Sequence, residues 1–213
     1  MKKRIAVLIS GSGTGLQALI DACADGRING EIVFVLSTTA KAYGLQRAAG
    51  AGILCKTVSK ADYATMGRCN QARHAAIRAA KPDLIICAGF LGIIPAWTVN
   101  AFKNKIINIH PALVPSFCGK GYYGRFVHEA VLKKGVKLTG ATVHFVDKGI
   151  DSGAVIMQRA VGVLPEDTYQ TLAARVTAIE HPMLIKAAAL FCLDLLRVED
   201  NRVQILSDVE CGG

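Results

Sequence analysis

The sequence has no Cys-x-x-Cys pair, although seven cysteines are scattered along its 213 residues. Their odd number and their places in apolar runs such as "LIICAGF" argue against a disulfide framework or a cysteine-based zinc site, and are typical of thiols in a reducing compartment. No segment reaches the roughly 18 to 20 apolar residues of a membrane span. The sequence therefore predicts a protein without structural disulfides and without a membrane partner.

Basic residues do not gather into a long run, although the formal net charge is +9. Nucleic-acid platforms interleave basic clusters with aromatic residues, and only 6% of this chain is aromatic. The charge therefore favours a small anionic ligand over a nucleic acid. The opening "MKKR" precedes an apolar run of only Ile5 to Ile9 that ends in glycines, which predicts the first strand of a cytoplasmic protein rather than a signal peptide.

Apolar residues make up 52% of the chain, which suits one compact domain with a substantial core. Runs rich in β-branched residues alternate with helical stretches, a pattern typical of a parallel α/β sheet that is covered on both faces. The predicted strands are 4–10, 31–38, 53–58, 83–89 and 105–110, and the predicted helices are 14–25, 42–51, 66–80 and 124–134.

The last part of the chain departs from this alternation. Strands predicted at 139–146 and 154–161 are too close for a crossover helix, so we expect an antiparallel pair, followed by a long helix over 167–195. The sequence thus predicts a single-domain α/β, Rossmann-like, mostly parallel sheet flanked by helices, with an antiparallel strand pair in its C-terminal part. We assign this domain to residues 1–195 and predict that 196–213 form a C-terminal tail with a possible edge strand.

Glycines 11, 13 and 15 stand between the first strand and the first helix, in "ISGSGTGLQALIDA". Such a turn exposes backbone N–H groups in front of a helix N-terminus, where a phosphate is the natural ligand. The spacing matches neither the dinucleotide-binding pattern nor the P-loop. An ordinary βα turn uses the same residues, so this stretch alone leaves both interpretations open.

Two later strands end in segments that could border a ligand crevice, because ligands of open parallel sheets bind beyond the carboxyl ends of the strands. The loop "AGFLGII" could accept a flat ring or could simply cap the core. In "NIHP", Asn108 and His110 lie two residues apart, so their side chains share one face of the strand. An amide and an imidazole can stabilise an oxyanion or carry a proton. A lone structural histidine is the alternative, and the Asn partner favours a site.

Three acidic residues are further candidates. Asp147 and Asp151 lie between the two late strands, where either could raise the pKa of His110 if the loop folds over it, although an Asp-Ser-Gly turn also explains the stretch. Glu180 lies in the long helix just before Pro182, which should break or kink that helix. Glu180 is either a ligand contact or a surface acid.

These motifs, taken together and in order, resemble the glycinamide ribonucleotide (phosphoribosylglycinamide) formyltransferases of de novo purine biosynthesis. The matching pieces are "VLISGSGTGLQALIDA", "AGFLGII", "INIHPALVPSF", "GATVHFVDKGIDSGAVI" and "EHP". The resemblance implies the formyltransferase fold. It also implies transfer of a formyl group from the cosubstrate 10-formyltetrahydrofolate to the amine of 5'-phosphoribosylglycinamide, without a metal. We expect a monomer or homodimer that binds no nucleic acid.

The resemblance also assigns residues. Asn108, His110 and Asp151 match the catalytic residues, with protonated His110 and Asn108 stabilising a tetrahedral oxyanion and Asp151 favouring the charged imidazole. The ribonucleotide is expected at Gly13, Thr14, Gly15, Thr177, Ala178, Ile179 and Glu180. The folate is expected at Leu91, Gly92, Ile93, Ile94, Asn108, Asp147, Lys148, Gly149, Ile150 and Asp151.

Several positions depart from the pattern of this family. Gly15 stands where an Asn is frequent, Gly92 replaces a frequent Arg, and Met66 lies where an Arg is expected to meet the folate tail, a role that Arg68 could fill. The loop "CGKGYYG" differs from the shorter Pro-Gly-x-His form. Our hypothesis is that Lys120 or Tyr122 in this loop helps to close the site.

Three other functions compete with this interpretation. Methionyl-tRNA formyltransferase is similar around "NIHP" but has a further C-terminal nucleic-acid-binding domain. Formyltetrahydrofolate hydrolase shares the catalytic residues but has a regulatory domain before its first strand. A non-enzymatic folate- or nucleotide-binding module should carry damaged catalytic residues, and here all three are present. The length of the chain favours the phosphoribosylglycinamide enzyme over the first two.

Overall fold

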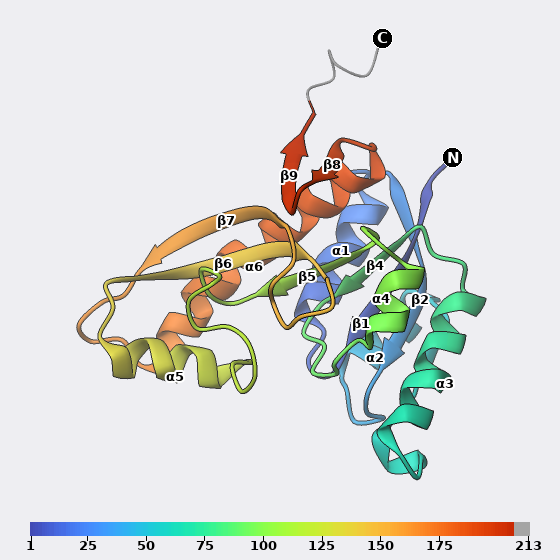
Figure 1. The fold of residues 1–213 in the computed structure, drawn as a ribbon, viewed down its shortest axis with the longest axis horizontal. Coiled ribbons are helices and arrows are strands. Elements are labelled where there is room, and N and C mark those ends of the chain that lie inside the picture. The colour runs from blue at the N-terminus through green and yellow to red at the C-terminus, as the bar shows by residue number, and fades with distance from the viewer. Residues whose placement is uncertain (207–213) are drawn as a thin grey trace.

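The computed structural model describes residues 1–206, which form a mostly parallel sheet flanked by helices (Figure 1). The sheet has the strand order β3-β2-β1-β4-β5-β6-β7. Its strands are β1 (Lys3–Ile9), β2 (Gly30–Ser37), β3 (Cys55–Thr57), β4 (Leu84–Cys87), β5 (Ile106–His110), β6 (Leu138–Phe145) and β7 (Val155–Gly162). The helices are α1 (Thr14–Ala24), α2 (Gly44–Gly50), α3 (Met66–Ala79), α4 (Ala96–Ala101), α5 (Arg125–Lys134) and α6 (Tyr169–Cys192), with a 3-10 turn, η1, at Lys60–Asp62.

The predicted fold class is confirmed. Strands β1 to β5 are paired in parallel, whereas β6 runs antiparallel to β5 and to β7. The sequence therefore placed the antiparallel pair correctly, and most element ends differ from the prediction by one to three residues. The short helix α4 and the turn η1 were not predicted.

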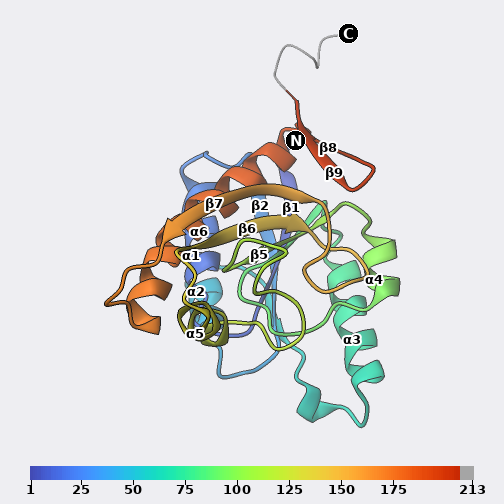
Figure 2. The same ribbon diagram turned by 60° about the vertical axis from the view of Figure 1, so that its left-hand side comes forward.

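The parallel strands are buried on both faces, as their apolar runs predicted. Along β1, Ile5 and Val7 point into one core cluster and Ala6 and Leu8 into another, because successive side chains of a strand alternate between faces. Helices α1 and α6 cover the first face and α3 and α4 the second, so that the sheet lies between two helical layers (Figures 1 and 2). Only the edges of the sheet and the ends of its strands are left for a ligand.

Helix α6 continues past Pro182 and is not broken there. A proline inside a helix removes the bond to the carbonyl four residues earlier, here that of Ala178. Both Ala178 and Pro182 are exposed, so solvent can satisfy the freed carbonyl. The helix starts from a capping box in which the Thr168 side chain accepts from the Thr171 N–H and the Thr171 side chain accepts from the Thr168 N–H.

The C-terminal tail differs in part from its prediction. A strand does form at β9 (Arg202–Ile205), but it pairs with β8 (Leu196–Glu199) in a separate two-stranded sheet instead of extending the main sheet (Figure 2). Asp200 and Asn201 make the turn with φ of 45° and 59°, a conformation that suits a two-residue hairpin turn. Residues 207–213 lie outside the described part, and the domain boundary at 195 stays a prediction.

The glycine loop after β1 is locked against the start of α2. Gly13 has φ +69°, and a Cβ placed on it would lie 2.5 Å from the Gly44 Cα, while the Gly44 N–H donates to the Gly11 carbonyl at 3.1 Å. Gly15 differs, because a Cβ there would make ordinary contacts of 3.5 Å with Ala88 and 3.8 Å with Leu184. Position 13 therefore requires glycine, whereas position 15 accepts a side chain.

We predict that Gly13→Ala lowers the free energy of unfolding by about 2 kcal/mol or more, because left-handed backbone and a close backbone approach both oppose a Cβ. Gly15→Ala should be neutral or stabilising by up to about 1 kcal/mol, since alanine is the better helix former. Urea unfolding monitored by circular dichroism measures both. Equal destabilisation by the two changes would contradict this account of the loop.

Candidate active site

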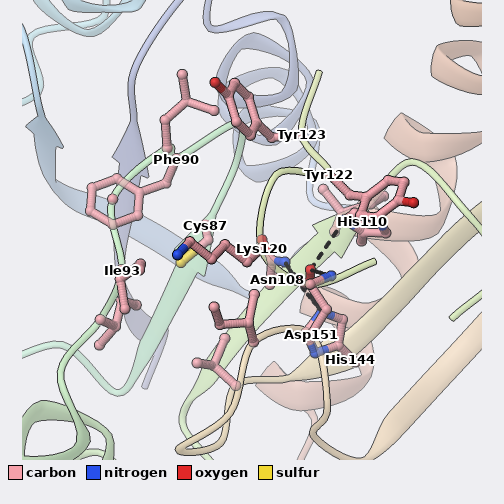
Figure 3. A pocket seen from close by; sticks show the side chains of 18 of the residues that line it. Cys87, Phe90, Ile93, Asn108, His110, Lys120, Tyr122, Tyr123, His144 and Asp151 are labelled. Carbon is pink, nitrogen blue, oxygen red and sulfur yellow. Dashed lines mark hydrogen bonds and ion pairs between the residues drawn. The ribbon is translucent and has the colours of Figure 1, made fainter. Parts of the chain in front are cut away.

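A cavity of about 440 Å³ opens at the carboxyl ends of β4 and β5 (Figure 3). Its walls come from the loop after β4, the end of β5, the loop before α5, the interior of β6 and the loop between β6 and β7. The predicted site residues that line it are Leu91, Gly92, Ile93, Ile94, Asn108, His110, Asp147, Gly149, Ile150 and Asp151. A largely apolar hollow with a few convergent polar groups is typical of a small-molecule site.

The loop between β6 and β7 folds over His110 and brings one carboxylate to it. Asp151 Oδ2 lies 3.6 Å from His110 Nδ1, and Asp151 Oδ1 accepts from Asn108 Nδ2 at 3.3 Å. Asp147 instead accepts from the Ser152 hydroxyl at 2.7 Å and the Gly149 N–H at 2.9 Å. Of the two acids that the sequence left open, Asp151 is the one that meets the imidazole.

The environment of His110 opposes its charge more strongly than the sequence suggested. Burial lowers the pKa of His110, and the opposing effects of the Phe117 carbonyl and the Asp151 carboxylate do not fully offset it. Both ring nitrogens nevertheless face acceptors. Nε2 donates to the Phe117 carbonyl at 2.8 Å, and Nδ1 faces the Asp151 carboxylate. The predicted effect of Asp151 is present, because its carboxylate acts to raise the pKa of His110, but burial acts more strongly in the opposite direction. A developing negative charge nearby would raise the pKa again.

Asp151 is held ionised by its neighbours. Burial acts to raise the pKa of Asp151, but His144, His110 and the Gly119 N–H outweigh it and keep the pKa below its usual range. The Gly119 N–H donates to Asp151 Oδ2 at 3.1 Å. The site therefore keeps a half-buried carboxylate beside an imidazole whose pKa burial lowers.

His144 is a site residue that the sequence analysis missed. It stands directly opposite Asn108 across the antiparallel β5–β6 ladder, and its Nε2 lies 3.2 Å from Asn108 Nδ2. Its Nδ1 lies 2.9 Å from the Phe145 carbonyl, so a neutral ring donates there and leaves Nε2 to accept from Asn108. The usable signal was the strand pairing, which places position 144 beside position 108.

The loop before α5 closes over the cavity. Residues Gly119 to Gly124 all line it, and the side chain of Lys120 extends across it in Figure 3. The backbone around this loop contacts His110 through the Phe117 carbonyl and Asp151 through the Gly119 N–H, so the positions of the loop and of these two side chains are linked. Tyr122 packs edge-on against Phe117, with 6.3 Å between ring centroids.

The residues predicted for the ribonucleotide lie outside this cavity, around the glycine loop and α6. The Leu184 Cδ2, one turn beyond Glu180, is 3.8 Å from the Cβ position of Gly15, so the two predicted segments approach each other. Burial raises the pKa of Glu180 to about 7, against a lowering contact with Thr177. The remaining members of this set are Gly13, Thr14, Ala178 and Ile179, and that they bind the ribonucleotide stays a prediction.

Two of the positions predicted for the folate, Lys148 and Gly92, have a distinctive placement. Lys148 is exposed and does not line the cavity. A Cβ on Gly92 would lie 2.6 Å from the Phe90 ring and 3.0 Å from Arg73 Nη1. Phe90 in turn stacks near Arg73, whose guanidinium carbon is 5.8 Å from the ring centroid. Gly92 therefore makes room for a Phe90 side chain that forms part of the wall.

Within residues 1–206, no group of three or more His, Cys, Asp or Glu side chains is arranged to hold a metal ion. No helix in the same part of the chain is long and apolar enough to cross a membrane.

A family model described as formyl transferase matches residues 3–188, and the chain belongs to this family. In structure it is similar to glycinamide ribonucleotide transformylase 1 from Symbiobacterium toebii, with a TM-score of 0.91 and 41% identity over 96% of this chain and 94% of that one.

Two relatives are similar to this chain over nearly its whole length. The chain is 33% identical over 208 residues to the chloroplastic phosphoribosylglycinamide formyltransferase of Arabidopsis thaliana, covering 97% of this chain and 71% of that protein. It is 41% identical over 202 residues to the trifunctional purine biosynthetic protein adenosine-3 of Chironomus tentans, covering 94% of this chain but only 14% of that protein. The chain thus spans about one seventh of the trifunctional relative.

We predict that Asp151→Asn lowers the pKa of His110 further, because the attraction between carboxylate and imidazolium is lost while burial remains. Titration of the His110 ring signals by NMR measures the change, with His110→Gln identifying the signal. Asp147→Asn is the matched control, since that carboxylate faces Ser152 and Gly149. A His110 pKa that stays the same in Asp151→Asn would contradict the assigned contact.

Proposed function

We propose that the protein transfers the formyl group of 10-formyltetrahydrofolate to the amine of 5'-phosphoribosylglycinamide, giving the N-formyl product and tetrahydrofolate. The observation that carries this proposal is the meeting of Asn108, His110 and Asp151 in one apolar-walled cavity. The named relatives support the same reaction, because they match this chain over nearly its whole length. Tetrahydrofolate's flat ring suits the apolar loops, and the carboxylate–imidazole–amide group suits acyl transfer.

The chemistry needs no nucleophile from the protein. The substrate amine attacks the formyl carbon, the carbonyl oxygen becomes an oxyanion, and N10 of the folate takes a proton as the carbon–nitrogen bond breaks. Asn108 Nδ2 is held by contacts of 3.3 Å to Asp151 and 3.2 Å to His144. An oxyanion is a stronger acceptor than either, because hydrogen bonds to charged groups are shorter and stronger. Asn108 can therefore redirect an N–H as the negative charge develops.

His110 completes this arrangement. Burial lowers its pKa, and the oxyanion raises that pKa as the tetrahedral intermediate forms. The proton of the attacking amine can then pass to the imidazole and onward to N10. Asp151, already ionised, stabilises the imidazolium that results.

We expect the ribonucleotide to bind outside the cavity, at the glycine loop and α6. Its phosphate would lie on the N–H groups of Gly13, Thr14 and Gly15 at the start of α1, where the helix dipole favours an anion. Glu180 would meet the ribose. Burial disfavours its charge and raises its pKa to about 7, and a ribose hydroxyl could donate a hydrogen bond to its carboxyl group. The net charge of +9 favours approach of this anionic substrate.

Location and assembly belong to the proposal as well. We propose a cytoplasmic protein that acts as a monomer or homodimer and binds neither nucleic acid nor membrane.

One assay of 10-formyltetrahydrofolate loss separates the proposed transfer from the alternative functions, hydrolysis and binding without turnover. Transfer requires both substrates, hydrolysis requires the folate alone, and a binding module shows no turnover.

Asn108→Ala and His110→Ala should each lower the turnover number by ~10² to 10³, the usual effect of removing an oxyanion donor. Both variants should keep the fold, which circular dichroism and thermal unfolding measure. Asn100→Ala, at an exposed position of α4, is the matched control and should turn over normally. Near wild-type turnover in either site variant would refute the proposed roles.

Lys120→Ala should raise the Michaelis constant for the folate several-fold with a smaller effect on turnover, because the side chain lies across the cavity and not beside the reacting trio. Steady-state kinetics with the folate varied at saturating ribonucleotide measures this. Lys133→Ala, exposed on α5, is the control. An unchanged Michaelis constant in Lys120→Ala would remove Lys120 from the closure of the site.

A further inference from the structure

The two loops assigned to the two substrates meet at a single side chain, that of Ser10. Ser10 follows β1 directly and precedes the glycine loop, and β1 lies between β2 and β4 in the sheet (Figure 1). The Leu91 N–H, in the loop after β4, donates to Ser10 Oγ at 2.9 Å. Thr38, at the end of β2, donates its hydroxyl to the same oxygen at 2.8 Å. One hydroxyl thus links the carboxyl ends of three neighbouring strands.

The hydrogen bond from the Leu91 N–H to Ser10 Oγ ties the loop after β4 to the segment that carries the glycine loop. Across residues 1–206, no other hydrogen bond joins 10–15 to 89–94. Phe90 and Ile94 anchor the loop after β4 on the second core cluster, whereas Leu91 and Ile93 are 61% and 68% exposed. Where the Leu91 backbone sits, and hence where the loop presents its apolar side chains to the cavity, depends on the Ser10 hydroxyl.

Ser10 does not line the cavity, whereas Leu91 does. The glycine loop that begins beside Ser10 carries the N–H groups assigned to the phosphate. A ligand bound to this loop stabilises the position of Ser10, and Ser10 in turn holds the Leu91 N–H for the second ligand. Coupling between the binding free energies of two sites is reciprocal, so each ligand should tighten the binding of the other.

We propose that Ser10 is a positioning residue that couples binding of the phosphate-bearing substrate to binding of the folate. This inference rests on the proposed function, since it takes its two ligands from there. It adds that the two substrates bind cooperatively, and that the Ser10–Leu91 bond carries the cooperativity. Ser10 touches neither substrate and acts through Leu91.

Calorimetric titration of tetrahydrofolate, with and without saturating 5'-phosphoribosylglycinamide, tests the proposal without turnover. In the unaltered protein the ribonucleotide should tighten tetrahydrofolate binding about fivefold or more, the lower end of ordinary coupling factors. In Ser10→Ala the factor should fall toward one, with tetrahydrofolate affinity in the ternary complex reduced about fivefold. Ser10→Thr keeps the hydroxyl and should keep the coupling.

Thr38→Val is the matched control, because it removes a hydroxyl contact of the same cluster while leaving the Leu91 N–H bound to Ser10. It should preserve the coupling factor. Unchanged coupling in Ser10→Ala, or an equal loss in Thr38→Val, overturns the role of Ser10. If both ligands bind the unaltered protein independently, the coupling proposal fails and the proposed function stands. If neither ligand binds, the proposed function itself fails and the coupling falls with it.

Discussion

The order in which strands are added to the sheet reverses at β1, because β2 and β3 lie on one side of it and β4 and β5 on the other. This reversal sets the position of the candidate site. The crossover segments therefore separate at the carboxyl ends of β1 and β4 and leave a crevice that no helix fills. The glycine loop, the Gly89 to Ile94 loop and the Asn108–His110 strand end all open into that region.

The polar side chains at the centre of the site are largely removed from water. His110 is 4% and His144 2% exposed, and the Asp151 carboxylate faces both. The Asn108 amide and the Gly119 N–H donate to this carboxylate, whose pKa stays below its usual range, while burial lowers the pKa of His110. These polar groups are already in position to stabilise a negative charge that develops on the substrate, which is the property that an acyl-transfer site requires.

The sequence predicted those features that depend on neighbours along the chain. Strands and most helices followed from apolar runs and their spacing, but α4 was missed because six residues after Pro95 are too short to display a helical period. Asn108 and His110 were found because they lie on one strand. His144 was missed because the register that sets it opposite Asn108 is a property of strand pairing. The effect of burial on the pKa of His110 was not predicted, because burial is not visible in a local motif.

The wall at Gly92 has a consequence for how this site can change. The space that a side chain at position 92 would need is filled by the Phe90 ring, 2.6 Å from the would-be Cβ. Replacing Gly92 by a longer residue is therefore conditional on what stands at position 90, and the same substitution can be harmless in one background and damaging in another. The two positions form an epistatic pair, so a larger residue at position 92 requires that Phe90 first be replaced or moved.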